Sequence, residues 1–126
     1  MRAYPASAIM LDAVVHYLRS EALRATGGDF NMRVSINILE LVARELRQQD
    51  DAEAREHQRL ISLLGEGELD ELRNSFCAGI ADGSFEVTDA KVLEHLRSTA
   101  LDRLAIDQPR YSAYRRAIER RAAAED

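Results

Sequence analysis

The chain has 126 residues, of which 46% are hydrophobic and 31% are charged, and its net charge is −5. This length predicts one domain, and this composition is typical of a folded globular protein rather than a disordered one. The negative charge argues against general nucleic-acid binding, because such binding depends on clustered cations. No apolar run approaches the ~20 residues of a transmembrane helix and no signal-peptide core is present. We therefore expect a cytoplasmic protein with no membrane segment.

The first half of the chain has helical periodicity. A helix is predicted over 5–25, which Pro5 opens and Gly27-Gly28 ends. A second predicted helix, 31–48, carries two apolar rows and should therefore be central, in contact with several neighbours. The rows are Met32, Ile36, Leu39, Ala43 and Leu46, and beside them Val34, Ile38, Leu41 and Val42.

The second half continues the pattern. Acidic residues at 50–53 predict the first turn of a helix over 51–64, and Gly65 and Gly67 separate it from a helix over 68–82. Thr88 is predicted to cap a helix over 89–106, and Pro109 to occupy the first position of a helix over 109–122. The inner face of the 89–106 helix is predicted to be Leu93, Leu96, Ala100 and Leu104. No segment predicts a strand, so the expected fold is all-α, a single-domain bundle of five to six helices.

The sequence lacks the motifs of the common enzyme classes. His16, His57 and His95 have no metal-ligand spacing, so no metal is expected, and each is interpreted as a surface or hydrogen-bonded core residue. Cys77 is interpreted as a small core residue. No phosphate-binding loop and no serine-nucleophile motif occurs, and no cofactor is expected. A catalytic role is therefore unsupported, and the sequence favours a non-enzymatic one.

One candidate site is a polar stripe on the predicted second helix. Arg33, Asn37 and Arg44 in this stripe could line a binding cleft, because a central helix has little surface to spare for polar groups. The alternative is a solvated face with contacts along the helix among Asn37, Glu40 and Arg44.

A second candidate is the corner before the last helix, formed by Asp107, Gln108, Tyr111 and Tyr114. These groups could bind a small polar ligand or a protein partner. The alternative is structural: Asp107 or Gln108 caps the last helix, while Tyr111, Tyr114 and Ile118 face the core. The arginines over 110–121 could contact phosphate or an acidic protein, or could form a solvated face.

Three segments together resemble a small bacterial family described only as a domain of unknown function. They are YPASAIMLDAVVHYLRSEAL, RVSINILELVAREL and LAIDQPRYSAYRRAI, and they extend over nearly the whole chain. Members commonly carry a histidine just before the Arg-Val pair, where this chain has Asn31-Met32, so no role of that histidine transfers here. Genes of the family often lie beside a phosphotransferase of the aminoglycoside-kinase type and an acyl-CoA dehydrogenase. The resemblance thus implies an accessory role in the breakdown of an acyl or hydroxy-acid compound.

We therefore expect an all-α accessory protein that binds a protein partner and forms a homodimer through an apolar helix face. A phosphotransferase or an acyl-CoA dehydrogenase is the partner that the resemblance implies. The alternative is a small-molecule binder or enzyme that uses Arg33, Asn37 and Arg44 around an acyl or phosphorylated compound. A third hypothesis, nucleic-acid binding through the arginines over 110–121, predicts an affinity that falls steeply with salt.

Overall fold

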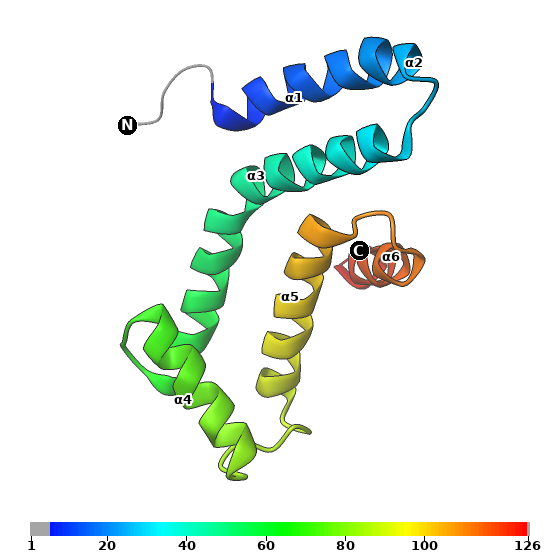
Figure 1. Ribbon diagram of the computed structural model, residues 1–126. Helices are drawn as coiled ribbons and strands as arrows, with labels where there is room; N and C mark the ends of the chain where they lie inside the picture. Colours follow the sequence, from blue (N-terminus) through cyan, green and yellow to red (C-terminus); the bar gives the residue numbers. More distant parts are fainter. Residues whose placement is uncertain (1–5, 126) are drawn as a thin grey trace. The chain divides into compact units, whose positions relative to one another are not determined.

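The computed structural model describes residues 6–125, which consist of helices and the turns between them (Figure 1). The helices are α1 Ser7–Tyr17, α2 Leu23–Ala25, α3 Phe30–Leu64, α4 Leu69–Ala81, α5 Ala90–Asp107 and α6 Ser112–Glu125, and a π-helical segment, Leu18–Ala22, joins α1 to α2. The prediction of an all-α fold is confirmed, since these residues contain no strand. The predicted helix start at Pro5 lies outside the described residues. None of the helices within 6–125 combines the length and the apolar character needed to cross a bilayer.

The predicted break between the second and third helices is wrong, because α3 runs without interruption from Phe30 to Leu64. The acids Asp50 and Asp51 lie inside this helix rather than at the start of a new one. No glycine or proline stands between 48 and 51, and aspartate costs only about 0.7 kcal/mol relative to alanine inside a helix. That cost is smaller than the loss of a turn of backbone hydrogen bonds, so the helix continues.

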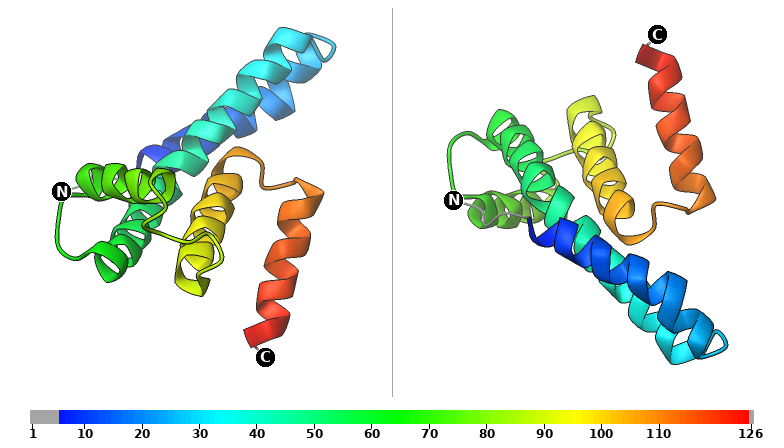
Figure 2. Two further views of the ribbon diagram at one scale, coloured as in Figure 1. Left: turned by 90° about the horizontal axis from the view of Figure 1, so that it is seen from below. Right: turned by 90° about the horizontal axis from the view of Figure 1, so that it is seen from above.

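The chain divides into two compact units, Met1–Asp50 and Asp51–Asp126, and the division falls within α3. In unit 1, α1 lies antiparallel to the first half of α3 (Figure 1, Figure 2). Two ion pairs fix this register. Asp12 of α1 pairs with Arg47 of α3, and Arg19, seven residues later in the π-helical segment, pairs with Glu40, seven residues earlier in α3. The buried apolar side chains of this unit are Ala8, Val15, Ile36 and Ala43.

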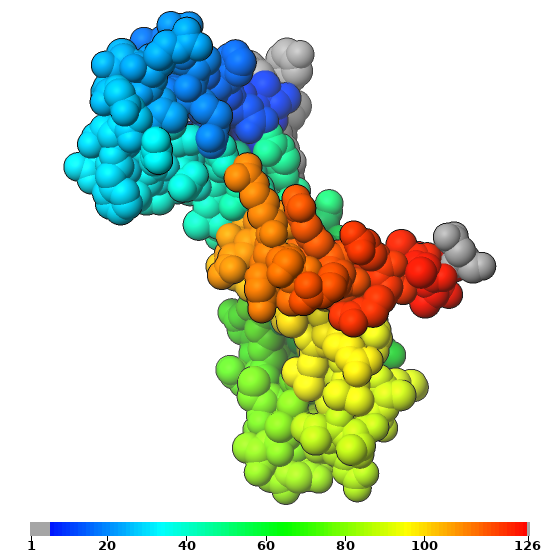
Figure 3. All heavy atoms as spheres, turned by 90° about the vertical axis from the view of Figure 1, so that its right-hand side faces the viewer, coloured from blue at the N-terminus to red at the C-terminus, as the bar shows by residue number. Residues whose placement is uncertain are grey.

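In unit 2 the core lies among the second half of α3, α4 and α5. Its buried cluster consists of Leu60, Leu72, Phe76 and Val92. The carboxylate of Glu56 on α3 accepts two hydrogen bonds from Arg73 on α4, at 2.9 Å from Nε and 2.6 Å from Nη2. Arg55 pairs with Asp102 at 3.0 Å and so joins α3 to α5. The last helix, α6, packs on α5 (Figure 3).

Three details of the second half differ from prediction. The side chain that caps α5 belongs to Asp89 rather than Thr88, and it accepts hydrogen bonds from the amides of residues 91 and 92. Helix α6 begins at Ser112 rather than Pro109. Pro109 is instead the second residue of a tight turn, in which the Tyr111 amide donates a hydrogen bond to the Gln108 carbonyl at 3.1 Å. Proline suits this position as well as it suits the first position of a helix.

The inner face of α5 is also displaced from prediction. The buried residues of this helix are Val92, His95 and Ile106, whereas Leu96, predicted to face inward, is 37% exposed. The first buried residue, Val92, stands one position before Leu93, the first residue of the predicted inner face. One position corresponds to about 100° around a helix, so the buried face of α5 is rotated by about that angle from the predicted one. This rotation brings His95 into the interior.

Candidate functional site

The predicted stripe on α3 lies at the surface of unit 1. Arg33 and Asn37 are exposed and Arg44 is half-buried. The guanidinium of Arg33 lies beside Gly28 in the turn before α3. Glu40, from the same stripe, pairs with Arg19 of the π-helical segment that follows α1. A shared cleft for Arg33, Asn37 and Arg44 therefore stays a prediction.

The corner before the last helix differs from the prediction that Asp107 or Gln108 caps that helix. Asp107 is the last residue of α5, and its carboxylate accepts a hydrogen bond from Arg103 Nε at 2.7 Å. Gln108 and Tyr111 are exposed and Tyr114 is half-buried. The prediction that these tyrosines and Ile118 form one inward face is wrong, because Tyr111 and Ile118 are 50% and 40% exposed.

The prediction that Cys77 is a core residue is also wrong, because the thiol is exposed. Leu72 and Phe76 occupy the buried side of α4, and Cys77 lies one residue, or about 100°, beyond Phe76. Among residues 6–125, no three His, Cys, Asp or Glu side chains gather in a way that could hold a metal ion.

A conspicuous surface feature of unit 1 is an exposed apolar row on α3. It consists of Phe30, Val34, Ile38, Val42 and Leu46, each of which is at least 38% exposed. The opposite face of the helix carries buried Ile36 and Ala43, together with the residues that pair with α1. Since Ile38 follows Ile36 by two residues, or about 200°, the middle of the apolar row points away from α1. The row turns by about 40° at each step, and its last member, Leu46, lies near the start of α1. The first half of α3 is therefore apolar on two sides and covered on one.

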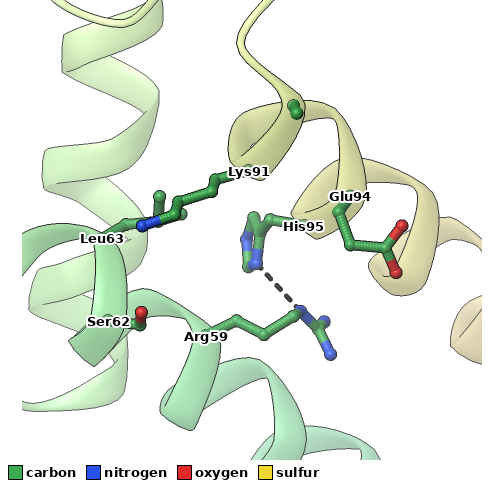
Figure 4. A pocket seen from close by; sticks show the side chains of 7 residues that line it. Arg59, Ser62, Leu63, Lys91, Glu94 and His95 are labelled. Carbon is green, nitrogen blue, oxygen red and sulfur yellow. Dashed lines mark hydrogen bonds between the residues drawn. The ribbon is translucent and has the colours of Figure 1, made fainter.

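A polar cluster lies inside unit 2, where α3 meets α5. His95 is 4% exposed, and its ring packs edge-on against Phe76 with ring centroids 4.8 Å apart. Arg59 on α3 donates from Nε to His95 Nδ1 at 3.1 Å and from Nη2 to Thr99 Oγ1 at 3.0 Å (Figure 4). His95 is the one buried polar residue within 6–125, so of its two interpretations, surface or hydrogen-bonded core residue, the structure shows the second.

The environment of this cluster disfavours positive charge. Burial lowers the pKa of His95, the cationic Arg59 lowers it further, and Glu56 partly opposes them. The pKa of Arg59 is lowered as well, chiefly by burial, against the attraction of Asp102 and Glu56. His95 is consequently neutral at pH 7, whereas Arg59 stays charged because an arginine pKa lies far above that pH.

A cavity of about 300 Å³ opens beside the cluster. Its lining comes from one face of each helix: Arg59, Ser62 and Leu63 of α3, and Ala90, Lys91, Glu94 and His95 of α5. In Figure 4, Lys91 extends from α5 toward Leu63, and Arg59 passes below the His95 ring. Lys91 is the single lysine of the chain. The sequence signal for this site was a histidine three residues after buried Val92, at helical spacing on an apolar face.

Comparison with known proteins identifies the family. A family model with the description "Domain of unknown function (DUF6285)" matches residues 21–111, which is well over half of the chain. The matched region includes α3, α4 and α5, and with them both the apolar row and the Arg59–His95 cluster. No curated protein and no solved structure matches the chain. The chain belongs to the DUF6285 family of domains of unknown function.

Proposed function

We propose that the chain is a non-enzymatic helical accessory protein that acts by binding proteins, and that the apolar row of α3 is its binding surface. The observation that carries this proposal is the row itself: five large apolar side chains, all at least 38% exposed, spaced four residues apart over the outer half of the helix surface. Single exposed apolar residues are ordinary on a protein surface, but a contiguous set marks an interaction site.

The first occupant that we assign to this row is a second copy of the chain. Unit 1 is a helical hairpin, and its described residues, 6–50, bury four apolar side chains, two of them alanines. Two-layer helical folds of this size are marginally stable alone, and oligomerisation is a usual remedy. Two hairpins that pack through their α3 rows would form a four-helix arrangement, a common solution for such apolar faces.

The experiment is sedimentation velocity and light scattering of the full chain over about 1 to 100 μM, a range that covers dimers of ordinary affinity. We expect a dimer. Ile38→Glu, in the centre of the row, should give a folded monomer, because a desolvated carboxylate opposes association. The matched control is Val87→Glu, which places the same charge at a residue that is 53% exposed in unit 2. A monomeric wild type at the highest concentration refutes the assignment of a second copy.

The family resemblance adds two candidate partners, a phosphotransferase of the aminoglycoside-kinase type and an acyl-CoA dehydrogenase, and with them a link to acyl or hydroxy-acid breakdown. Co-expression of the tagged chain with each enzyme tests this part of the proposal. Retention of either enzyme by the wild type and by Val87→Glu, with loss in Ile38→Glu, would support docking that depends on the row or on the dimer that it forms. Retention of neither would remove the accessory role for these two enzymes.

A further inference from the structure

We propose that the cavity between α3 and α5 binds a small oxyanion, the carboxylate or phosphate group of a small molecule. This site is separate from the apolar row and does not depend on the proposed function. Its basis is a set of hydrogen-bond donors at one cavity that have no acceptor within residues 6–125.

Arg59 supplies the fixed positive charge. Its guanidinium has five N–H donors, of which the structure uses one on Nε, for His95, and one on Nη2, for Thr99. Neither acceptor is anionic, and Arg59 forms no ion pair with the described residues. Both hydrogens of Nη1 and the second hydrogen of Nη2 remain, and this end-on pair of nitrogens matches the two oxygens of a carboxylate or phosphate.

His95 supplies a second donor whose tautomer is set by Arg59. Because Nδ1 accepts the hydrogen bond from Arg59 Nε, a neutral His95 must carry its proton on Nε2. Nε2 has no hydrogen-bond partner among the described residues, and no buried side-chain nitrogen of these residues is left unsatisfied. Nε2 is therefore not sealed in the core, and His95 lines the cavity, so this N–H is available there.

Two more donors lie around the same opening. Lys91 and Ser62 are exposed, and neither side chain has a hydrogen-bond or ion-pair partner within the described part of the chain. One acid, Glu94, also lines the cavity, but its carboxylate accepts hydrogen bonds from Arg121 at 3.0 Å and from Ser98 at 2.9 Å. Asp102 and Glu56 also attract Arg59, but Asp102 is paired with Arg55 and Glu56 with Arg73. With these three acids already paired, the positive charge of Arg59 and Lys91 determines the sign of the ligand.

The size and the apolar part of the lining restrict the ligand further. The pocket has a volume of about 300 Å³ and opens to solvent, so it holds a small molecule or one end of a larger one. Leu63 and Ala90 provide apolar contact beside the donors. An anion with a short aliphatic chain would contact both the hydrogen-bond donors and the apolar side chains. The lining therefore favours a carboxylate of a few carbons over inorganic phosphate.

The test is two-dimensional NMR of the uniformly ¹⁵N-labelled full chain, with butyrate, inorganic phosphate and butyramide as probes at constant ionic strength. The Arg59 Nε–H and the His95 ring nitrogens report directly on the site. We expect saturable shifts at both residues with butyrate, smaller ones with phosphate and none with the neutral butyramide. A larger response to phosphate would keep the oxyanion site and change its ligand class.

Variants separate binding from folding. Lys91→Gln and Ser62→Ala alter exposed side chains, so both should fold, and Lys91→Gln should weaken butyrate binding about tenfold, the effect of losing one charged hydrogen bond. Arg59→Gln should abolish it. The matched control is Arg97→Gln, which removes an exposed cation from α5 outside this cavity and should leave the affinity unchanged. Butyrate shifts that are linear rather than saturable, or an equal loss in Arg97→Gln and Lys91→Gln, would overturn the proposal.

Discussion

Alanine at position 79 should destabilise unit 2, even though alanine forms helices better than glycine. A Cβ added to Gly79 would lie 2.4 Å from Phe85 Cδ2 and 2.7 Å from Cε2. Carbon atoms in contact are normally ~3.5–4.0 Å apart, so the overlap exceeds about 1 Å. Phe85 cannot shift as a body, since its amide donates to the Gly79 carbonyl at 3.0 Å and its ring packs on Phe76 with centroids 5.5 Å apart.

The gain in helix propensity is smaller than the cost of overpacking. Replacing glycine by alanine inside α4 should gain about 1 kcal/mol in helix propensity. Overpacking costs roughly 1–3 kcal/mol, and the upper part of that range applies because both the backbone and the ring of Phe85 are held. The expected net loss is about 1–2 kcal/mol in the free energy of unfolding. Urea denaturation followed by circular dichroism should show a lower midpoint with an unchanged slope.

A double-mutant cycle isolates the ring as the cause. In a Phe85→Ala background the obstruction is absent, so Gly79→Ala should stabilise the chain by about 0.5–1 kcal/mol, the helix-propensity gain alone. The reasoning depends on this change of sign rather than on either magnitude. If Gly79→Ala destabilises the Phe85→Ala background by as much as it destabilises the wild type, contact with Phe85 is not the reason that glycine is needed.

Two further predictions concern the charged groups of unit 2. The pKa of His95 is lowered from its ordinary value of 6.5, so below that pH the unfolded chain takes up a proton before the folded chain does, and the free energy of unfolding should fall as the pH falls. Urea midpoints between pH 7 and pH 5 check this; His95→Gln should flatten the slope, and an unchanged slope would contradict it. Glu56→Gln should lower the free energy of unfolding by about 1–2 kcal/mol, because it removes the charge from a paired carboxylate whose side chain is 15% exposed. The control Arg97→Ala, at an exposed site, should change that free energy by less than about 0.5 kcal/mol. Equal urea midpoints for these two variants would show that the Glu56–Arg73 pair contributes nothing.

The all-α fold could be predicted because apolar spacing and glycine are local signals. Gly27 and Gly28 have φ angles of 69° and 83°, and Gly65 has 94°, so each helix end that relied on them was predicted correctly. The errors occurred where a residue type is compatible with more than one local structure. Acids at 50–53 suit a helix start but also a helix interior, and Pro109 suits a first helical turn but also a tight turn.

The Arg59–His95 cluster could not be predicted in the same way, because its members lie 36 residues apart on two helices. Contact between them depends on the rotation of α5, and periodicity placed the inner face of that helix one residue too late. With Leu93 and Leu96 inward, His95 would have been a surface residue. With Val92 and His95 inward, the same histidine meets Phe76 and Arg59. When a helix carries apolar residues on several sides, its periodicity does not determine which side is buried, and tertiary packing decides it.

At two places the described part of the chain departs from a sequence optimised for stability, and these are the places where we assign binding. Unit 1 leaves large apolar side chains of α3 in water although its own core is small. Unit 2 holds the cation of Arg59 against a neutral histidine and threonine rather than against a carboxylate, although apolar residues would fill that space without the cost of desolvation. Neither departure improves the stability of the chain by itself. Each becomes favourable only when a second molecule supplies the missing surface or the missing anion, which is why binding explains both better than folding does.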